Sequence, residues 1–455
     1  MDVSSRLAEL CAEYKVPGAA LGIVRDGELT EVATGVINLN TGVDVTTDTL
    51  FQIGSITKVW TTTVVMQLVD EGLVDLDVPV RTYLPTFKVA DPDVSERVTL
   101  RHLLTHTSGI DGDHFEDFGR GDDCVERYVD ACATLQQTHP LGATMSYCNT
   151  GFSVAGRVIE VLTGKVWDEA MRERLFEPLG LKQTCTLPEE ALLHRTAVGH
   201  IAPEPGGEPE VASRWVLPRI GGPMGIINST VSEVLAFAKM HMARGRAADG
   251  TQVLSERSVA AMQERQVEVP NPHSLGSHWG VGWILFDWNG RRLYGHDGGT
   301  LGQSAYLRVA PDADLAMTLL TNGGEPSRVY RTLFTELFKE LAGIDMPPLP
   351  EAPTTPPDLD LSRYAGTYKR LSVRIDLSEE DGHLAGVSTL SGPLAEMLPN
   401  PVTKITLTPV DATTFLLLAE GASAPVPAAF YDFHDGTPRQ LHYGARTHPR
   451  TATRE

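Results

Sequence analysis

The chain has 455 residues, 42% hydrophobic and 21% charged, as in a globular protein large enough for more than one domain. With 59 acidic against 38 basic side chains, the formal net charge is −21. This charge disfavours nucleic acid and anionic membranes as partners, and no apolar run is long enough to cross a bilayer.

The first segment predicts a helix and then a β-hairpin. Pro17-Gly18 ends an opening helical pattern, and the apolar run 19–24 predicts a strand. Asp26-Gly27 predicts a tight turn into a second strand at 31–34. Residues 1–7 have neither a basic start nor an apolar core, so we expect no signal peptide and a cytoplasmic protein. Five cysteines without zinc-type spacing agree with free thiols in a reducing compartment.

Ser55 and Lys58 form the only Ser-x-x-Lys of the chain, where an extended run meets Gly54 and becomes helical. If Ser55 opens that helix, Lys58 lies one turn on and on the same face. A serine hydroxyl becomes nucleophilic when a base takes its proton, and a buried lysine can be that base because burial lowers its pKa. The alternative is an N-cap serine followed by a solvated lysine.

Tyr147-Cys148-Asn149 is the only Tyr-x-Asn and precedes a helical pattern. Alternate residues of an extended stretch point the same way, so Tyr147 and Asn149 can face one cavity while Cys148 points into packing. A phenol can relay protons, and the Asn149 amide can hold a substrate carbonyl. The alternative is a helix N-cap at Asn149 beside a core tyrosine.

The third motif is His296-Asp297-Gly298-Gly299, between strand-like runs at 283–286 and 304–309. Glycines at this place let a substrate backbone lie close against a strand. The alternative is a glycine-rich hairpin turn.

Helical patterns fill much of 56–265, strands return at 280–322, and a last helical pattern covers 328–342. This order predicts an α/β fold of the α+β type, an antiparallel sheet flanked by helices with an all-helical lobe. A proline-rich linker follows at 346–358, and short alternating runs at 359–455 predict a small β-barrel. We therefore expect residues 1–345 to form the catalytic domain.

The three motifs, in this order, resemble those of the serine β-lactamase and penicillin-binding-protein superfamily, over roughly residues 5–340. Segments 101–109 and 221–225 look like its class C branch. The third motif is His-x-Gly in place of Lys-Thr-Gly, as in D-alanyl-D-alanine carboxypeptidases, D-aminopeptidases and related esterases. The barrel resembles the lipocalin-like C-terminal domains attached to some of these enzymes.

The resemblance implies acyl transfer through a covalent intermediate on Ser55, with Lys58 as base, Tyr147 in the proton relay and His296 polarising this network. It also implies an oxyanion hole made by the backbone N–H groups of Ser55 and Gly299. Asn149, Asp297 and Gly298 are the expected substrate-binding residues, and neither a metal nor another cofactor is expected.

The expected function is hydrolysis of small esters, amides or peptides. Losing the lysine of the third motif removes a cation that would hold a β-lactam carboxylate, so efficient β-lactamase activity is not expected. A transacylase or peptide-cyclising thioesterase is the second hypothesis, and a non-catalytic binding relative is the third. The expected partner is a small-molecule or peptide acyl substrate, and the sequence leaves the oligomeric state open.

Overall fold

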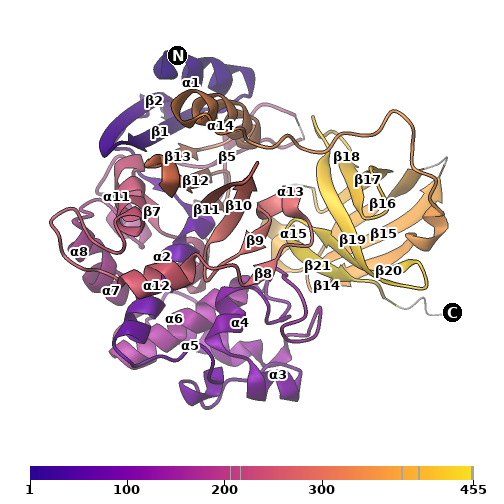
Figure 1. Cartoon of the computed structure of the whole chain (residues 1–455), viewed down its shortest axis with the longest axis horizontal. Helices are drawn as coiled ribbons and strands as arrows, with labels where there is room; N and C mark the ends of the chain where they lie inside the picture. The colour runs from indigo at the N-terminus through magenta and orange to yellow at the C-terminus, as the bar shows by residue number, and fades with distance from the viewer. Residues whose placement is uncertain (205, 216, 381–382, 398–399, 452–455) are drawn as a thin grey trace.

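The structure is a computed structural model of the chain, and it describes residues 1–204, 206–215, 217–380, 383–397 and 400–451 (Figure 1). It consists of a larger N-terminal part, built on a nine-stranded sheet, and an eight-stranded β part near the C-terminus. No helix in these ranges is long and apolar enough to cross a membrane.

The nine-stranded sheet is antiparallel in every pair and has the order β3-β2-β1-β13-β12-β11-β10-β9-β8. Its strands are β1 Gly18–Arg25, β2 Glu28–Asn38, β3 Val43–Asp44, β8 Val267–Glu268, β9 His278–Trp279, β10 Ile284–Trp288, β11 Arg291–Gly299, β12 Ser304–Ala310 and β13 Leu315–Thr321. Asp26 and Gly27 both have positive φ between β1 and β2, so the expected hairpin turn is confirmed.

Helices cover both faces of this sheet because residues of β1 alternate between two cores. Ala19, Leu21 and Ile23 pack with the helices α1 (Val3–Glu13) and α14 (Pro326–Ala342), whereas Ala20 and Val24 pack with the helices of the other face. The main helices of that other core are α2 Thr57–Asp70, α11 Val231–Met242 and α12 Glu256–Met262. The antiparallel sheet flanked by helices is therefore confirmed.

A helical lobe continues the second core and lies at the lower side of Figure 1. Its helices are α3 Pro92–Arg97, α4 Leu100–Leu104, α5 Cys124–Ala131, α6 Asn149–Thr163, α7 Trp167–Met171, α8 Glu177–Leu179, α9 Pro188–Ala191 and α10 Gly222–Gly225. Two short strand pairs lie outside the large sheets: β4 (Phe51–Gln52) with β7 (Asn228–Ser229), and β5 (His200–Ile201) with β6 (Glu210–Val211). The one-turn helix α13 covers Pro272–Leu275.

Ser55 differs in one detail from the sequence prediction. It lies in the 3₁₀ turn η1 (Gly54–Ile56), and α2 begins two residues later, at Thr57. The tighter turn passes directly into α2, so Lys58 still follows Ser55 by about one turn.

The C-terminal strands form a nearly closed barrel in the order β14 to β21. They are β14 Gly366–Arg370, β15 Val373–Glu380, β16 His383–Leu390, β17 Val402–Pro409, β18 Thr414–Ala419, β19 Val426–His434, β20 Thr437–Tyr443 and β21 Arg446–Pro449, with α15 at Pro393–Met397. An isolated bridge between Tyr368 and Arg450 joins the two ends of the sheet. Residues 452–455 of the expected barrel domain lie outside the described ranges.

The barrel has a core of its own, filled by large side chains such as Tyr368, Phe415 and Phe430. The boundary after residue 345 and the linker at 346–358 stay predictions from the sequence. The barrel also contacts the larger part: Asn271 Nδ2 donates to the carbonyl of Pro427 at 2.8 Å, and Tyr147 N donates to the carbonyl of Ala445 at 2.9 Å.

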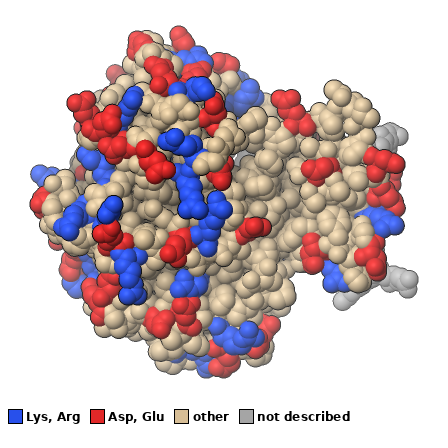
Figure 2. Space-filling model, in the orientation of Figure 1, with Lys and Arg blue, Asp and Glu red and all other residues tan. Residues whose placement is uncertain are grey.

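Charged side chains of both signs are interspersed over the face shown in Figure 2. All five cysteines are buried and unpaired, as their number and spacing predict.

The contact between η1 and the end of β11 gives a stability prediction. A Cβ at Gly298 would lie 1.9 Å from the carbonyl oxygen of Ile53, whereas one at Gly299 would meet no atom within 4 Å. We expect G298A to lower the free energy of unfolding by about 1–3 kcal/mol because the backbone must shift, and G299A to change it little. Thermal unfolding of the two variants beside the unmodified chain checks this, and equal midpoints for G298A and G299A would contradict the close contact.

Candidate active site

Glycines allow η1 to pack directly against the end of β11. Gly54 has a φ of +53°, and a Cβ there would lie 2.5 Å from the backbone nitrogen of Gly299. A Cβ at Gly298 would lie 3.0 Å from the backbone nitrogen of Ser55. This packing brings the backbone nitrogens of Ser55 and Gly299 into the same region, as expected for the two oxyanion donors. Two such donors fit the charge that develops on a carbonyl oxygen under attack.

Lys58 lies directly beneath Ser55. Its Nζ is 3.1 Å from Ser55 Oγ and 2.5 Å from the carbonyl oxygen of Met224, which it bonds as a donor. The side chain is fully buried, and this burial lowers the pKa of Lys58 well below its ordinary value, with Arg446 adding to the effect. An unprotonated amine at hydrogen-bond distance from a serine hydroxyl can take its proton.

The carbonyl of Met224 comes from a segment that the sequence marked by its glycines and proline. This segment forms η5 (Arg219–Gly221) and α10, and the preceding carbonyl, of Pro223, accepts a hydrogen bond from Thr61 Oγ1 at 2.8 Å. The segment thus holds α2 at two successive points and supplies one hydrogen-bond acceptor to the lysine.

Tyr147 stands beside both members of the pair. Its ring centroid is 4.9 Å from Lys58 Nζ, and the ring stacks on His106 with centroids 4.2 Å apart. Burial raises the pKa of Tyr147, and a hydrogen bond with Ser55 lowers it by a smaller amount. Tyr147 is therefore a neutral phenol within reach of the Ser55 hydroxyl. His106 fixes this stretch further, since its Nδ1 accepts the N–H of Cys148 at 2.9 Å.

His296 is a neutral side chain in this site. Its Nδ1 lies 2.6 Å from the carbonyl oxygen of Asp297 and donates to it, and burial lowers the pKa of His296 to about 3. The ring therefore offers Nε2 as a buried acceptor and carries no positive charge at neutral pH. It cannot supply the cation that a lysine would give at this position.

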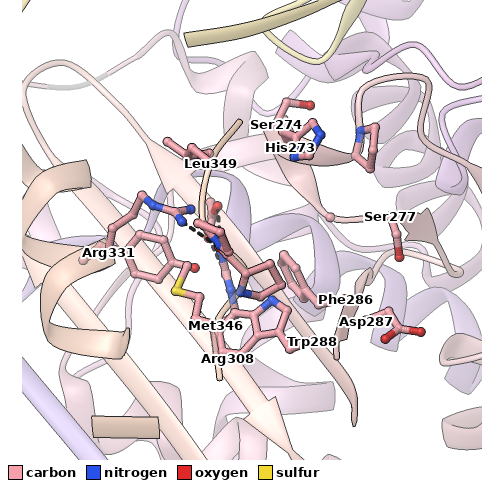
Figure 3. A pocket seen from close by; sticks show the side chains of 16 residues that line it. His273, Ser274, Ser277, Phe286, Asp287, Trp288, Arg308, Arg331, Met346 and Leu349 are labelled. Atoms are coloured by element: carbon pink, nitrogen blue, oxygen red, sulfur yellow. Dashed lines mark hydrogen bonds and ion pairs between the residues drawn. The ribbon is translucent and has the colours of Figure 1, made fainter. Parts of the chain in front are cut away.

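Asp297 points away from Ser55, because neighbouring residues of β11 alternate between the faces of the sheet. Its carboxylate pairs with the buried Arg308, with Oδ2 at 3.1 Å from Nη2. Arg308 in turn lies over the ring of Phe286, at 4.1 Å from the centroid, in the pocket shown in Figure 3. The carboxylate of Asp297 is thus engaged with Arg308. If Asp297 contacts the substrate as expected, it does so through its backbone, as Gly298 would.

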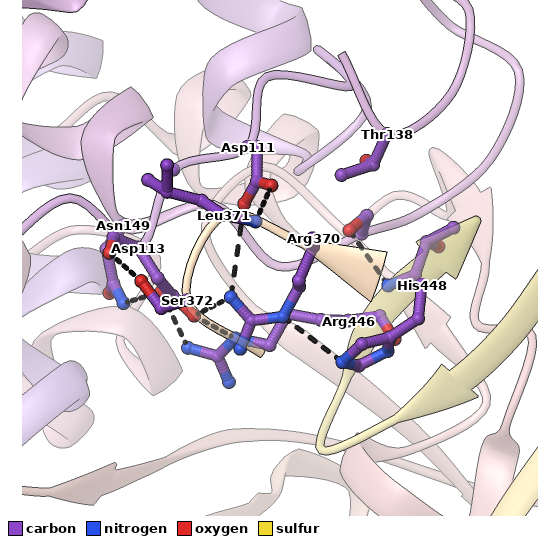
Figure 4. Close-up of polar contacts among 12 residues, drawn as sticks. Asp111, Asp113, Thr138, Asn149, Arg370, Leu371, Ser372, Arg446 and His448 are labelled. Atoms are coloured by element: carbon purple, nitrogen blue, oxygen red, sulfur yellow. Dashed lines mark hydrogen bonds and ion pairs between the residues drawn. The ribbon is translucent and has the colours of Figure 1, made fainter. Parts of the chain in front are cut away.

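Asn149 is held by a carboxylate that the sequence reasoning missed. Its Nδ2 donates to Asp113 Oδ1 at 2.7 Å, and Asp113 also bonds Arg446 and Arg370 of the barrel (Figure 4). Both arginines lower the pKa of Asp113, which burial alone would raise. Asp113 follows the segment 101–109 closely, so that segment could have directed attention to it. No local pattern marks Arg446, which approaches Tyr147 only in the folded chain.

The residues of all three motifs meet at one cavity of about 400 Å³. Its polar lining includes Ser55, Tyr147, Asn149, His296 and Arg446. The apolar lining residues are Phe115, Leu217, Met224, Leu275 and Leu301. Among the described residues, in this cavity and elsewhere, no group of three His, Cys, Asp or Glu side chains is arranged to bind a metal ion.

The buried lysine gives a pH prediction. The pKa of Lys58 is lower in the folded chain than in the unfolded one, so between the two values the unfolded chain binds more protons. Stability should therefore fall as the pH falls in this window, by about 1.4 kcal/mol per pH unit. K58M should lack this dependence and gain stability relative to the unmodified chain as the pH falls below the ordinary lysine pKa of about 10.4.

Thermal unfolding as a function of pH measures this difference. K339M, at a lysine on the surface of α14, is the control and should follow the unmodified chain. Parallel pH profiles for K58M and the unmodified chain would show that Lys58 keeps its ordinary pKa.

Known proteins resemble this chain in sequence and in fold over nearly its whole length. The family model described as Beta-lactamase matches residues 3–340. Penicillin-binding protein 4 of Amycolatopsis lactamdurans is 50% identical over 80% of this chain and 96% of its own length. A D-aminopeptidase of Brucella anthropi is 28% identical over 70% of this chain and 59% of its own length.

Among solved structures, SurE superposes with a TM-score of 0.78 at 29% identity, over 99% of this chain and 98% of SurE. A structure of SurE with D-Leu gives 0.76 at 28% identity, with the same coverage. The family match, the relative at 50% identity and the similarity in fold agree, and the chain belongs to the beta-lactamase family of serine hydrolases.

Proposed function

We propose that the chain hydrolyses short amides, peptides and esters through an acyl-enzyme on Ser55, and that it favours D-configured acyl residues. The observation that carries this is the buried Lys58 Nζ at 3.1 Å from Ser55 Oγ, in the cavity that Tyr147 lines. The preference for D-residues rests on the similarity to a D-aminopeptidase and to SurE, which has a structure with D-Leu.

In the first step, Lys58 takes the proton of Ser55 Oγ as that oxygen attacks the substrate carbonyl. The carbonyl oxygen becomes an oxyanion that accepts hydrogen bonds from the N–H groups of Ser55 and Gly299, each of which can stabilise the transition state by about 3–4 kcal/mol. The tetrahedral intermediate then loses the amine or alcohol, which takes a proton from Lys58 directly or through Tyr147. An ester on Ser55 remains.

In the second step, water attacks this ester and gives its proton to Lys58, directly or through Tyr147. The acid product leaves, and Ser55 regains its proton. Asn149, held by Asp113, is placed to donate its second amide N–H or offer its carbonyl to the backbone of the acyl chain. His296 acts as a neutral neighbour of Tyr147, with ring centroids 6.4 Å apart, and orients the phenol rather than adding charge.

Acyl transfer is the second candidate, because it differs from hydrolysis only in the nucleophile that attacks the ester. The apolar lining formed by Phe115, Leu217, Leu275 and Leu301 favours a hydrophobic amine or alcohol over water in part of the cavity. Product analysis with candidate amines present, set against water alone, separates the two reactions.

The first experiment tests the nucleophile and its base. S55A should abolish covalent labelling by a fluorophosphonate probe, and K58A should reduce labelling by a comparable factor because the two side chains act as one unit. S378A, at an exposed serine of the barrel, should label like the unmodified chain. Mass spectrometry that finds the probe on a serine other than Ser55 would refute the assignment.

The second experiment tests the substrate class. Short p-nitrophenyl esters and D-aminoacyl p-nitroanilides should be cleaved with a higher kcat/KM than cephalosporins, since neutral His296 replaces a cation in the third motif. D-leucine p-nitroanilide should exceed its L-enantiomer by about tenfold or more, which corresponds to about 1.4 kcal/mol of discrimination. Cephalosporin turnover equal to ester turnover, or equal rates for both enantiomers, would contradict these two parts of the proposal separately.

A further inference from the structure

The cavity beside Ser55 receives one positively charged side chain, and the barrel supplies it. Arg446 opens β21, and its guanidinium carbon lies 4.6 Å from the centroid of the Tyr147 ring. Among the described residues that line this cavity, it is the one Lys or Arg. Lys58 is fully buried and is not among the residues that line the cavity, and burial lowers the pKa of His296 to about 3.

The guanidinium is held in place from behind. Its Nε and Nη2 donate to the two oxygens of Asp113 at 2.9 and 3.2 Å, and Nη1 donates to the carbonyl of Gly444 at 2.8 Å. These bonds leave further N–H groups without a partner, because a guanidinium has more donors than three. The side chain keeps 25% of its surface exposed, so the cavity has access to it.

Arg446 is not the one partner of Asp113. Its carboxylate also pairs with Arg370, at 2.9 Å, and Arg370 lies 3.9 Å from Asp111, so two guanidinium groups and two buried acids form one network (Figure 4). The nearby Asp111 accepts the N–H of Leu371, and burial raises its pKa. Asp297, the acidic residue among those that line the cavity, is paired with Arg308 behind β11.

Resting on the function proposed above, we propose that Arg446 binds a carboxylate of the substrate beside Ser55. A pre-positioned guanidinium with spare N–H groups forms charge-assisted hydrogen bonds with such an anion. The barrel then determines specificity at a site whose nucleophile, base and oxyanion donors all come from the larger part. The carboxylate can come from the C-terminus of a peptide or from an acidic side chain, and the two sources share this chemistry.

Two matched pairs of compounds test the inference on the full chain. The first pair compares N-acetyl-D-leucyl-D-alanine, which has a free carboxylate, with its neutral C-terminal amide. The second pair compares D-glutamyl p-nitroanilide, which has an acidic side chain, with the neutral D-glutaminyl p-nitroanilide. Each is measured as a substrate and as a competitive inhibitor of p-nitrophenyl butyrate cleavage. The unmodified chain should prefer the anionic member of at least one pair by about tenfold or more, and this ratio should fall as the salt concentration rises.

Variants of the guanidinium assign the preference to its residue. R446Q should bring the ratio of anionic to neutral compound close to one, and R446K should keep part of it because the charge remains. R450Q is the control: Arg450 also belongs to the barrel, but it bonds the carbonyls of Arg363 and Ala365, and its loss should leave the ratio unchanged.

A ratio below about twofold for both pairs in the unmodified chain would overturn the inference, even if R446Q fails to fold. An equal loss for both members of a pair in R446Q would show a structural role instead. Inhibition constants report on binding by Arg446 even where the peptides are not cleaved. Failure of the fluorophosphonate probe to label Ser55 would instead contradict the proposed function and leave the inference about Arg446 untouched.

Discussion

The burial of one amine, that of Lys58, is the constraint on which the rest of the site depends. Burial disfavours an ammonium in this position and lowers the pKa of Lys58, which favours the unprotonated base. Three groups define its position: the hydroxyl of Ser55, the carbonyl of Met224 and the ring of Tyr147. These come from η1, α10 and the stretch just before α6, so the site forms only when the sheet, α2 and the helical lobe pack together. The same burial makes the site a source of instability that other parts of the fold offset.

A second constraint is the close backbone contact between η1 and the end of β11. Side chains at Gly54 or Gly298 would separate these segments, and the N–H groups of Ser55 and Gly299 would then no longer meet. Two neighbouring glycines in β11 therefore serve different purposes: Gly298 allows the close contact, and Gly299 is the residue whose N–H we propose as an oxyanion donor. A flexible turn would not keep such donors aimed at one point, whereas a central strand of a nine-stranded sheet does so.

The barrel belongs to the site more closely than a structural cap would. Its residues Arg370, Ala445 and Arg446 contact Asp113 and the stretch that carries Tyr147 and Asn149. Asp113 links these contacts to Asn149, so the second motif is oriented from both parts of the chain. A cation is thereby present in the cavity although the third motif lacks one. Arg446 lies over the ring of Tyr147, whereas a lysine of the third motif would lie at the end of β11. The positive charge therefore stands at a different place in this pocket.

The sequence by itself determined the order of the elements, the separate C-terminal barrel, and the pairing of Ser55 with Lys58. Such features depend on short-range spacing: one helical turn, the alternation of a strand, or two turn residues. It also predicted that Tyr147, Asn149 and His296 would be brought to the nucleophile, through the resemblance of the motifs. Only the tertiary structure decided that His296 is neutral, that the Asp297 carboxylate faces Arg308, and that Arg446 lies beside Tyr147. The physical reason is that burial and ion pairing depend on segments hundreds of residues apart, whose approach no local pattern records.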